Sequence, residues 1–381
     1  MRRLRICFVA DVYPVLHPEL GVTFGGAEVQ VLQLARTLAC LAPGPLLEIS
    51  FVVADHGQRE VEEAEGFEFH RSYRPDEGVR GLRLIHPRAS RLGFAMTRAR
   101  ADVYYQRCAG TATGLVALGC LLHRRPFVFA VANDRDVDLS FEADHGPAHR
   151  ALYRLGLARA SRIVVQTGHQ ARLLAANHGR RGALVRSVCP VRASGPRRPS
   201  GAPVLWVGAL DSAKKRPELL LSLARSLPGR TFRVVGGGEP DAVRSFREKM
   251  HGLANVEFVG PVAWERVLEF YRESDLVVTT SAHEGFSNVL LEGWSCGVPS
   301  VSLEHDPDGT IERFGLGARS GSVPAMREDI ERLLGSPDRY ERASAAAIDY
   351  VRRHHAPEAA AEAYRRIFLA VANRRGTRHV S

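Results

Sequence analysis

The spacing of apolar residues predicts an alternation of strands and helices. Short apolar runs rich in β-branched residues recur along the chain, and most are separated by stretches of helical periodicity. The predicted strands are Leu4–Ala10, Ile49–Ala54, Leu82–Ile85, Val103–Gln106, Phe127–Ala132 and Ile163–Gln166, then Val204–Val207, Phe232–Val235, Val256–Pro261, Leu276–Thr280 and Val298–Leu303. This alternation is typical of an α/β protein with mostly parallel, doubly wound sheets.

The predicted helices fit between these strands, and one segment breaks the pattern. The helices are Ala27–Leu41, Thr111–Leu122, Ala148–Arg159, a helix ending at Leu227, Asn288–Cys296, Met326–Leu334, Pro337–His354 and Glu358–Asn373. Residues 190–203 are rich in Pro, Gly and Ser and fit neither period, so they predict a linker. We therefore expect one domain over residues 1–190 and a second over residues 204–356.

Composition is compatible with two ordinary globular cores. The chain has 381 residues, of which 45% are hydrophobic. Its formal charge of +10 comes from 52 basic and 42 acidic residues, but the lysines are only Lys214, Lys215 and Lys249. A skew toward arginine is most simply a genome-composition effect. The basic charge stays compatible with acidic substrates or an anionic membrane surface.

Several function classes are disfavoured by what the sequence lacks. No basic stripe interleaved with aromatic residues indicates nucleic-acid binding. Six cysteines are scattered without C-x-x-C pairs, which favours reduced thiols in a cytosol and disfavours metal ligation. Asp11 interrupts the first apolar run, so the N-terminus predicts a strand and not a signal peptide. We expect a cytoplasmic protein.

Any membrane association is expected to be peripheral. The longest apolar run, residues 114–122, is far below the roughly 20 residues that a bilayer span needs. The helix near residues 149–162 carries four arginines around an apolar face. Such a helix can lie on an anionic membrane at its inner face, although an ordinary half-buried surface helix is the commoner interpretation.

The stretch 275–303 carries the strongest candidate chemistry. Two strands bracket a loop at 281–286 and one helix, with Glu284 in the loop and Glu292 on the helix, about two turns further on. Ser287 is the expected N-cap. The helix N-terminus offers N–H groups to a phosphate, and carboxylates accept bonds from vicinal hydroxyls. Taken singly, Glu284 is more simply explained as a residue that favours a helix start, and Glu292 as a solvated helix residue. Taken together, the two glutamates match a ligand that has a diphosphate between hydroxyl groups.

Two motifs resemble a known family. The string E-G-F-S-N-V-L-L-E-G followed by C-G-V-P resembles the glutamate-seven-residues-glutamate motif of retaining glycosyltransferases of the GT-B fold, family 4 (glycosyl transferases group 1). The stretch from Gly208 to Pro217 resembles the family's V-G-R-L-x-x-x-K-x-P segment, although Ala209 replaces the usual arginine and one residue is inserted. The phosphate-binding lysine is therefore Lys214 or Lys215. A compact ammonium suits a phosphate.

The resemblance implies a fold and a donor site. The fold is GT-B, with two Rossmann-like domains facing across a cleft, an N-terminal acceptor domain, a C-terminal donor domain, and a last segment (357–381) that packs back on the N-terminal domain. Glu284 would bind the transferred sugar, Glu292 the ribose, and Lys214 or Lys215 the diphosphate. The implied donor-binding positions are Gly25, Gly26, Gly208, Gly237, Glu284, Gly285, Phe286, Ser287, Asn288 and Glu292.

Asn133 and Asp134 are the candidate acceptor-side residues. They follow a predicted strand, at the sheet edge where open α/β folds bind ligands. The D-x-D spacings that start at Asp134 and Asp136 are too common to indicate a metal site. A solvated turn is the competing interpretation. Many family members have a histidine at the end of this strand, where this chain has Asn133.

The predicted function is transfer of a sugar from a nucleoside diphosphate sugar to a hydroxyl acceptor, with retention of the anomeric configuration. The acceptor is expected to be a polysaccharide, a lipid-linked sugar or a small glycoside. The resemblance implies no cofactor and no metal. The alternatives are a same-fold epimerase or phosphorylase, and a nucleotide-sugar-binding subunit without turnover, for which Ala209 and Asn133 are the motivating departures. A dehydrogenase is disfavoured because no G-x-G-x-x-G opens the first helix.

Overall fold

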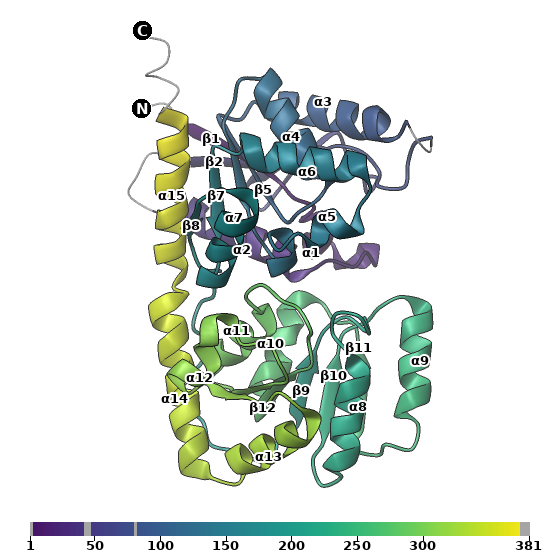
Figure 1. Ribbon diagram of the computed structural model, residues 1–381, viewed down its shortest axis with the longest axis vertical. Helices are drawn as coiled ribbons and strands as arrows, with labels where there is room; N and C mark the ends of the chain where they lie inside the picture. The colour runs from purple at the N-terminus through teal and green to yellow at the C-terminus, as the bar shows by residue number, and fades with distance from the viewer. Residues whose placement is uncertain (1–2, 42–46, 80–81, 374–381) are drawn as a thin grey trace. The chain divides into compact units, whose positions relative to one another are not determined.

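A computed structural model describes residues 3–41, 47–79 and 82–373, and it divides into two compact units (Figure 1). Unit 1 comprises the described residues up to Val188 together with the last helix, α15 (Pro357–Asn373). Unit 2 is Cys189–Ala356. Each unit has its own parallel sheet and its own buried core.

The sheet of unit 1 contains eight strands among the described residues, in the order β3-β4-β2-β1-β5-β6-β7-β8. Neighbouring strands are parallel except β3 and β4, which form an antiparallel pair at one end. The strands are β1 (Leu4–Val9), β2 (Leu47–Val53), β3 (Val61–Ala64), β4 (Phe67–Arg71), β5 (Val103–Arg107), β6 (Phe127–Ala130), β7 (Arg162–Val165) and β8 (Gly182–Leu184). The central strands are buried throughout, as parallel strands covered by helices must be.

Two groups of helices accompany this sheet. Helix α3 packs on α4, and α4 packs on α6, while α15 lies beside α2 (Figure 1). The helical segments are α1 (Tyr13–Leu16), η1 (Pro18–Leu20), α2 (Gly26–Cys40), η2 (Leu84–Ala89), α3 (Ser90–Ala99), α4 (Thr111–Leu122), η3 (Asp134–Asp136), α5 (Ser140–Asp144), α6 (Pro147–Arg159) and α7 (Gly168–His178).

Unit 2 has a six-stranded, wholly parallel sheet among the described residues, in the order β11-β10-β9-β12-β13-β14. Its strands are β9 (Val204–Val207), β10 (Phe232–Val235), β11 (Val256–Gly260), β12 (Leu276–Thr279), β13 (Ser300–Ser302) and β14 (Gly317–Arg319). Its helical segments are α8 (Pro217–Ser226), α9 (Pro240–Met250), α10 (Trp264–Arg272), α11 (Asn288–Ser295), η4 (Pro307–Gly309), α12 (Thr310–Phe314), α13 (Val323–Leu334) and α14 (Pro337–His354). Because the strands are parallel, all loops that follow them lie at one edge.

The predicted strand at Leu82–Ile85 is wrong. Leu82 lies in a turn, and Leu84–Ala89 is a short π-helical segment that leads into α3. Leu82 and Ile85 are 62% and 68% exposed, so their apolar side chains have no buried sheet face to fill. On the side away from β1, strand β2 pairs with β4, whose Phe67 and Phe69 are buried. The hairpin β3–β4 and the helices α3 and α7 are absent from the predicted elements.

Helix α15 belongs to unit 1 because its aromatic side chains pack against that unit. It contacts α2 and β5. The Phe368 ring lies 6.2 Å from Phe8 and 6.1 Å from Tyr105, both centroid to centroid, and Tyr364 packs edge-on against Tyr105. Burial of such large rings is the main stabilising term for a helix at a chain end.

Helices α4 and α6 approach closely because two glycines face the contact. A Cβ atom added at Gly114 would lie 2.3 Å from the carbonyl oxygen of Leu152, and one added at Gly156 would lie 2.7 Å from Thr113 Cγ2. Backbone cannot yield as a flexible side chain can, so no larger residue fits at Gly114 without moving a helix.

We therefore expect Gly114→Ala to destabilise unit 1 by about 2 to 3 kcal/mol, although alanine is the better helix former. Gly93→Ala in α3 is the matched control, because nothing lies within 4 Å of a Cβ atom there. Gly93→Ala should raise the free energy of unfolding of unit 1 by about 0.5 to 1 kcal/mol. Denaturant unfolding of the two variants measures both effects, and stabilisation by Gly114→Ala would contradict the close helix contact.

Candidate functional site

An ion pair at the carboxyl edge of unit 2 joins two of the predicted site residues. Lys215 Nζ donates a hydrogen bond to Glu284 Oε1. Lys215 lies in the loop between β9 and α8, and Glu284 lies in the loop between β12 and α11. Strands β9 and β12 are hydrogen-bonded neighbours, so their following loops meet at the same edge.

Hydrogen bonds through Thr280 hold these two loops together. The Thr280 hydroxyl donates to the carbonyl of Lys215 (2.5 Å) and accepts from the indole N–H of Trp206 (3.0 Å). The Thr280 carbonyl accepts from Arg216 Nε (2.7 Å), and Arg216 also donates to Glu304 (2.9 Å). Thr280 and Trp206 are buried, so these bonds are shielded from water and fix the position of Lys215.

The two candidate lysines have different environments. Lys214 is exposed, and its backbone carbonyl accepts a hydrogen bond from Ala282 N (2.8 Å). The Lys215 side chain is 22% exposed and reaches Glu284. A Cβ atom at Gly208 would lie 3.5 Å from Lys215 Cδ and 3.1 Å from the Trp206 ring, so the glycine leaves room for the lysine stem. The geometry therefore places Lys215, and not Lys214, beside Glu284.

Glu284 is ionised because of its cationic neighbours. Burial alone would raise the pKa of its carboxyl, but attraction to Lys215 and the hydrogen bond between them outweigh burial, with His305 adding to the effect, and the pKa is lowered. The Glu284 side chain is only 16% exposed. A half-buried carboxylate of this kind is a strong acceptor for a hydroxyl group.

Glu292 occupies the second turn of α11 in a different environment. Burial raises the pKa of its carboxyl, while a hydrogen bond from Trp264 Nε1 to Glu292 Oε1 (3.3 Å) partly opposes that shift. Trp264 begins α10 after strand β11, at the same edge of the sheet. Trp264 was not among the predicted site residues. Its position just after a parallel strand was the available signal.

The start of α11 lies between the two glutamates in sequence. Ser287 is the N-cap residue and makes no side-chain capping bond, and Asn288 is the first helical residue. Gly285 and Ser287 are buried. Phe286 is a core residue whose ring lies 6.2 Å from Trp294 and 4.7 Å from His355. Phe286 therefore anchors this turn, and its side chain packs inward.

A second glycine turn packs against the loop that follows β9. Gly236 has φ +136°, and a Cβ atom there would lie 1.9 Å from the carbonyl oxygen of Gly208. The carbonyl of Gly237 accepts from Leu210 N (2.7 Å). Ala209, at the position where the family has arginine, is exposed. These contacts bring the loops after β9 and β10 into direct backbone contact.

In unit 1 the glycine pair begins helix α2. Gly25 is the N-cap and Gly26 the first residue, and both are exposed. The Gly25 N–H donates to Glu28 Oε2 (3.0 Å). Burial raises the pKa of Glu28, and attraction to Arg107 partly opposes this. Arg107 ends strand β5 at the same sheet edge and was not among the predicted site residues.

Asn133 and Asp134 begin the short helix η3 after strand β6. The Asn133 side chain caps it by accepting from Arg135 N (3.0 Å). Asp134 accepts from Gln170 Nε2 (3.1 Å), and His169 Nε2 lies 3.9 Å from its second oxygen. Burial raises the pKa of the Asp134 carboxyl to about 6, against the effects of both partners. His169 and Gln170, which lie on α7, were not among the predicted site residues.

Two further observations concern the described residues as a whole. No group of three or more His, Cys, Asp or Glu side chains in residues 3–41, 47–79 and 82–373 is arranged to hold a metal ion. Within the same ranges, none of the helices combines the length and apolar character needed to span a bilayer.

Two Rossmann-like units, with an acid–lysine pair and a phosphate-compatible helix start in unit 2, define the GT-B class of glycosyltransferase folds. Solved structures share this fold over nearly the whole chain. Sucrose-phosphate synthase from Thermosynechococcus elongatus is 17% identical, with a TM-score of 0.77 over 97% of this chain and 100% of that one. HepE from Anabaena, in complex with UDP-glucose, is 16% identical with a TM-score of 0.73 over 97% and 100%. The predicted α/β fold of two doubly wound domains is confirmed.

Residues 202–336 match the model of the family described as glycosyl transferases group 1, so the resemblance recognised from the motifs is confirmed. Among curated relatives, the D-inositol 3-phosphate glycosyltransferase of Rhodococcus erythropolis is 27% identical over 248 residues, which is 55% of this chain and 54% of that protein. The enzyme of the same name from Acidothermus cellulolyticus is 31% identical over 38% of this chain and 39% of its own. The chain thus spans about half the length, or less, of these relatives.

The raised pKa of Asp134 predicts a pH-dependent effect of Asp134→Asn. Because the pKa of Asp134 is raised in the folded chain, its contribution to the free energy of unfolding is fully present below the ordinary value of 3.8. That contribution is lost as the pH rises through about 6. Asparagine cannot ionise. The variant should therefore gain about 2 kcal/mol relative to the native chain between pH 4 and pH 7. Denaturant unfolding across that range measures it, and a pH-independent difference would refute the buried, partly neutral carboxyl.

Proposed function

We propose that this protein is a retaining glycosyltransferase that moves a sugar from a nucleoside diphosphate sugar to a hydroxyl acceptor. The observation that carries the proposal is the Lys215–Glu284 pair at the carboxyl edge of unit 2, next to the start of α11. Names of similar proteins support it. HepE was solved with UDP-glucose, and the curated relatives are named as glycosyltransferases.

In the proposed donor complex, the diphosphate competes with Glu284 for Lys215. A diphosphate carries more charge than one carboxylate, so the ammonium group moves toward it. Glu284 then loses its cation and accepts hydrogen bonds from hydroxyls of the transferred sugar. Glu292, held by Trp264 on α11, accepts from the ribose hydroxyls. The two carboxylates thus bind opposite ends of one ligand.

Catalysis in this proposal is stabilisation of the leaving group. Negative charge develops on the departing diphosphate, where Lys215 and the first N–H groups of α11 place positive charge. No side chain is assigned as a nucleophile. The leaving phosphate takes the acceptor proton on the same face of the sugar, so the anomeric configuration is retained. No metal or cofactor takes part in the proposed step.

Unit 1 is the proposed acceptor unit. Asn133 and Asp134, the proposed acceptor-side residues, lie after β6. Gly25 and Gly26, which the resemblance gives as donor-binding positions, lie after β1 at the same edge of the sheet. A carboxyl with a pKa of about 6, such as Asp134, exchanges protons readily near neutral pH, so it suits contact with an acceptor hydroxyl. The acceptor is a polysaccharide, a lipid-linked sugar or a small glycoside. We place the reaction in the cytoplasm, with a peripheral membrane contact for a lipid-linked acceptor.

One observation favours a second candidate, a nucleotide-sugar-binding subunit without turnover. The family arginine is replaced by the exposed Ala209, and the nearby Arg216 already engages Thr280 and Glu304. Incubation of the purified protein with a panel of nucleoside diphosphate sugars separates the candidates. A transferase releases nucleoside diphosphate and forms a glycoside. A binding subunit binds the donor and releases nothing, and a free epimerised sugar would indicate an epimerase.

The two adjacent lysines provide a matched pair of variants. Lys215→Ala should lower turnover at least 100-fold, because it removes the charge next to the leaving group and leaves Glu284 half-buried and unpaired. Lys214→Ala removes an exposed ammonium and should change turnover less than about three-fold. Steady-state kinetics on both variants measures this. Equal losses would refute the assignment to Lys215.

The two glutamates should separate in their kinetic effects. Glu292→Gln should chiefly weaken nucleotide affinity, because a ribose contact is made equally in the ground and transition states. Glu284→Gln should chiefly lower kcat, because it alters the group that holds the transferred sugar. Titration of nucleoside diphosphate together with donor kinetics gives both numbers. Small and equal effects of the two variants would defeat these roles.

A further inference from the structure

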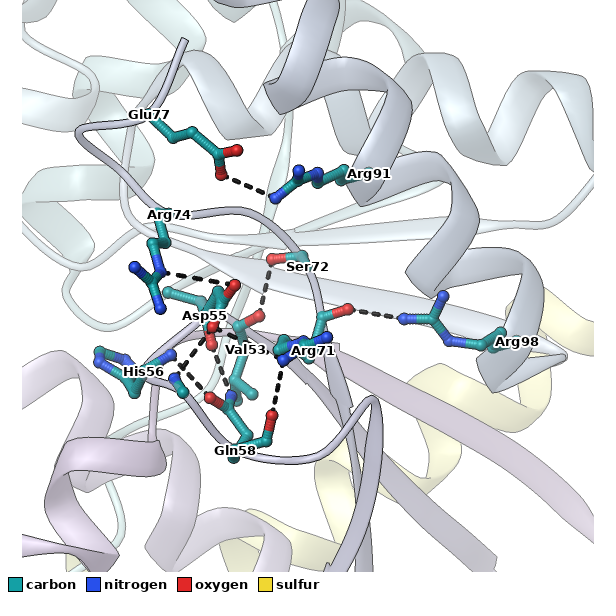
Figure 2. Close-up of polar contacts among 12 residues, drawn as sticks. Val53, Asp55, His56, Gln58, Arg71, Ser72, Arg74, Glu77, Arg91 and Arg98 are labelled. Carbon is teal, nitrogen blue, oxygen red and sulfur yellow. Dashed lines mark hydrogen bonds and ion pairs between the residues drawn. The ribbon is translucent and has the colours of Figure 1, made fainter.

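A second polar site lies at the carboxyl edge of the unit 1 sheet, away from the residues assigned above. It is an open groove of about 690 Å³ formed by the loop after β2, the end of β4 and one side of α3 (Figure 2). A smaller hollow of about 330 Å³ shares Asp55 and Arg91 with it. Both adjoin the ends of parallel strands, where open α/β sheets bind ligands.

Arginines dominate the lining of this groove. Arg71, Arg91, Arg98 and Arg100 face it, against the carboxylates of Asp55 and Glu60, an excess of two positive charges. Arg100 ends α3 with φ +46°, a conformation that glycine adopts without cost and that costs other residues about 1 kcal/mol. Guanidinium groups are the side chains best suited to bind phosphate, sulfate or carboxylate through two parallel bonds.

The acidic residues of the groove are already engaged. Asp55 accepts from Gly57 N (2.9 Å) and lies 3.6 Å from Arg74 Nε and 3.9 Å from a terminal nitrogen of Arg71. Glu60 lies at the rim, with a side chain that is 65% exposed, and pairs with Arg98 (2.7 Å). An exposed pair of this kind is weak and exchanges readily for another anion. Neither carboxylate therefore blocks an incoming oxyanion.

The arginines are held in place but keep donors to offer. Arg98 donates to the carbonyl of Arg71 (2.6 Å), and Arg71 donates to the carbonyl of Gln58 (2.8 Å), as Figure 2 shows. Arg91 donates one bond to Glu77 (2.7 Å). Arg98 Nε is buried without a hydrogen-bond partner among the described residues. A guanidinium group carries five N–H donors, more than the bonds that Arg91 and Arg98 make here, so donors remain for a bound oxyanion.

One wall of the groove is apolar. Phe94 on α3 is 66% exposed and faces the same groove as the guanidinium groups. An exposed aromatic ring beside a polar cluster commonly packs on the C–H face of a sugar ring. We propose that this groove binds the acidic end of a longer acceptor: a sugar unit whose ring packs on Phe94 and whose phosphate, sulfate or carboxylate is held by Arg91 and Arg98, while another unit of the same acceptor reaches Asn133 and Asp134. The inference rests on the proposed function, because it names the class of its acceptor.

Matched pairs of hexoses test the inference. Each pair consists of a neutral hexose and the same hexose with a 6-phosphate, a 6-sulfate or a C6 carboxylate, and binding to the full chain is measured by calorimetry. At least one acidic member should bind ten-fold or more tightly than its neutral partner, and more tightly than inorganic phosphate. Equal binding within every pair overturns the inference. Inorganic phosphate binding as tightly as the sugar phosphates would indicate a free-anion site and overturns the acceptor assignment.

The double variant Arg91→Gln/Arg98→Gln tests whether the groove is the binding site for the acidic sugar. It should reduce the preference for the acidic sugar at least ten-fold while donor hydrolysis without acceptor stays unchanged. Arg353→Gln is the matched control, because that arginine is 71% exposed on α14 of unit 2 and pairs with an acid in the same way. A preference that survives in a folded double variant overturns the site. If the double variant does not fold, Arg91→Gln alone gives the same comparison.

This test separates the inference from the proposed function. Calorimetry needs no turnover, so an acid preference without release of nucleoside diphosphate would refute the transferase and keep the groove. Donor hydrolysis without any acid preference would keep the transferase and refute the groove.

Discussion

The ion pair between Lys215 and Glu284 is the interaction on which the candidate site depends. Both groups are largely removed from water, and each would be costly there alone, because breaking a buried pair by removing one partner costs about 3 to 5 kcal/mol. The pair exists because β9 and β12 are parallel neighbours, and because Thr280 bonds the two following loops to each other and to the buried Trp206. The sheet thus positions a cation and an anion before any ligand arrives. A ligand with a diphosphate and hydroxyls can satisfy both groups at once.

The carboxyl edge of the unit 1 sheet repeats this principle with other residues. The segments at and after the strand ends carry Glu28, which is on α2 near Arg107, then Asp134, which accepts from Gln170, and the arginine groove beside Asp55. In each case a buried or half-buried charged group is only partly compensated by protein, and burial shifts its pKa or leaves a donor unpaired. Partly compensated charges are expected where a ligand completes the set.

Local patterns predicted the elements whose boundaries are marked in the local sequence. Strands β9 and β10 and helices α4 and α14 begin and end where the pattern places them, because each is a continuous apolar or periodic run bounded by Gly, Pro or a cap. Leu82–Ile85 looks like a strand by composition, yet no neighbouring strand buries it. The motif located Glu284 and Glu292, but adjacent lysines could not be told apart without the bond through Thr280. Three site residues were not predicted because their partners are distant in sequence: Trp264, Arg107 and His169.

A crystal structure with a bound, non-hydrolysable nucleoside diphosphate sugar would test the assignment of the Lys215–Glu284 pair to the donor site. Under this assignment the diphosphate lies against Lys215 Nζ and the start of α11, the Lys215–Glu284 bond has opened, and Glu284 accepts a hydrogen bond from the sugar. A diphosphate bound elsewhere, or bound there with the Lys215–Glu284 pair unchanged, would contradict it.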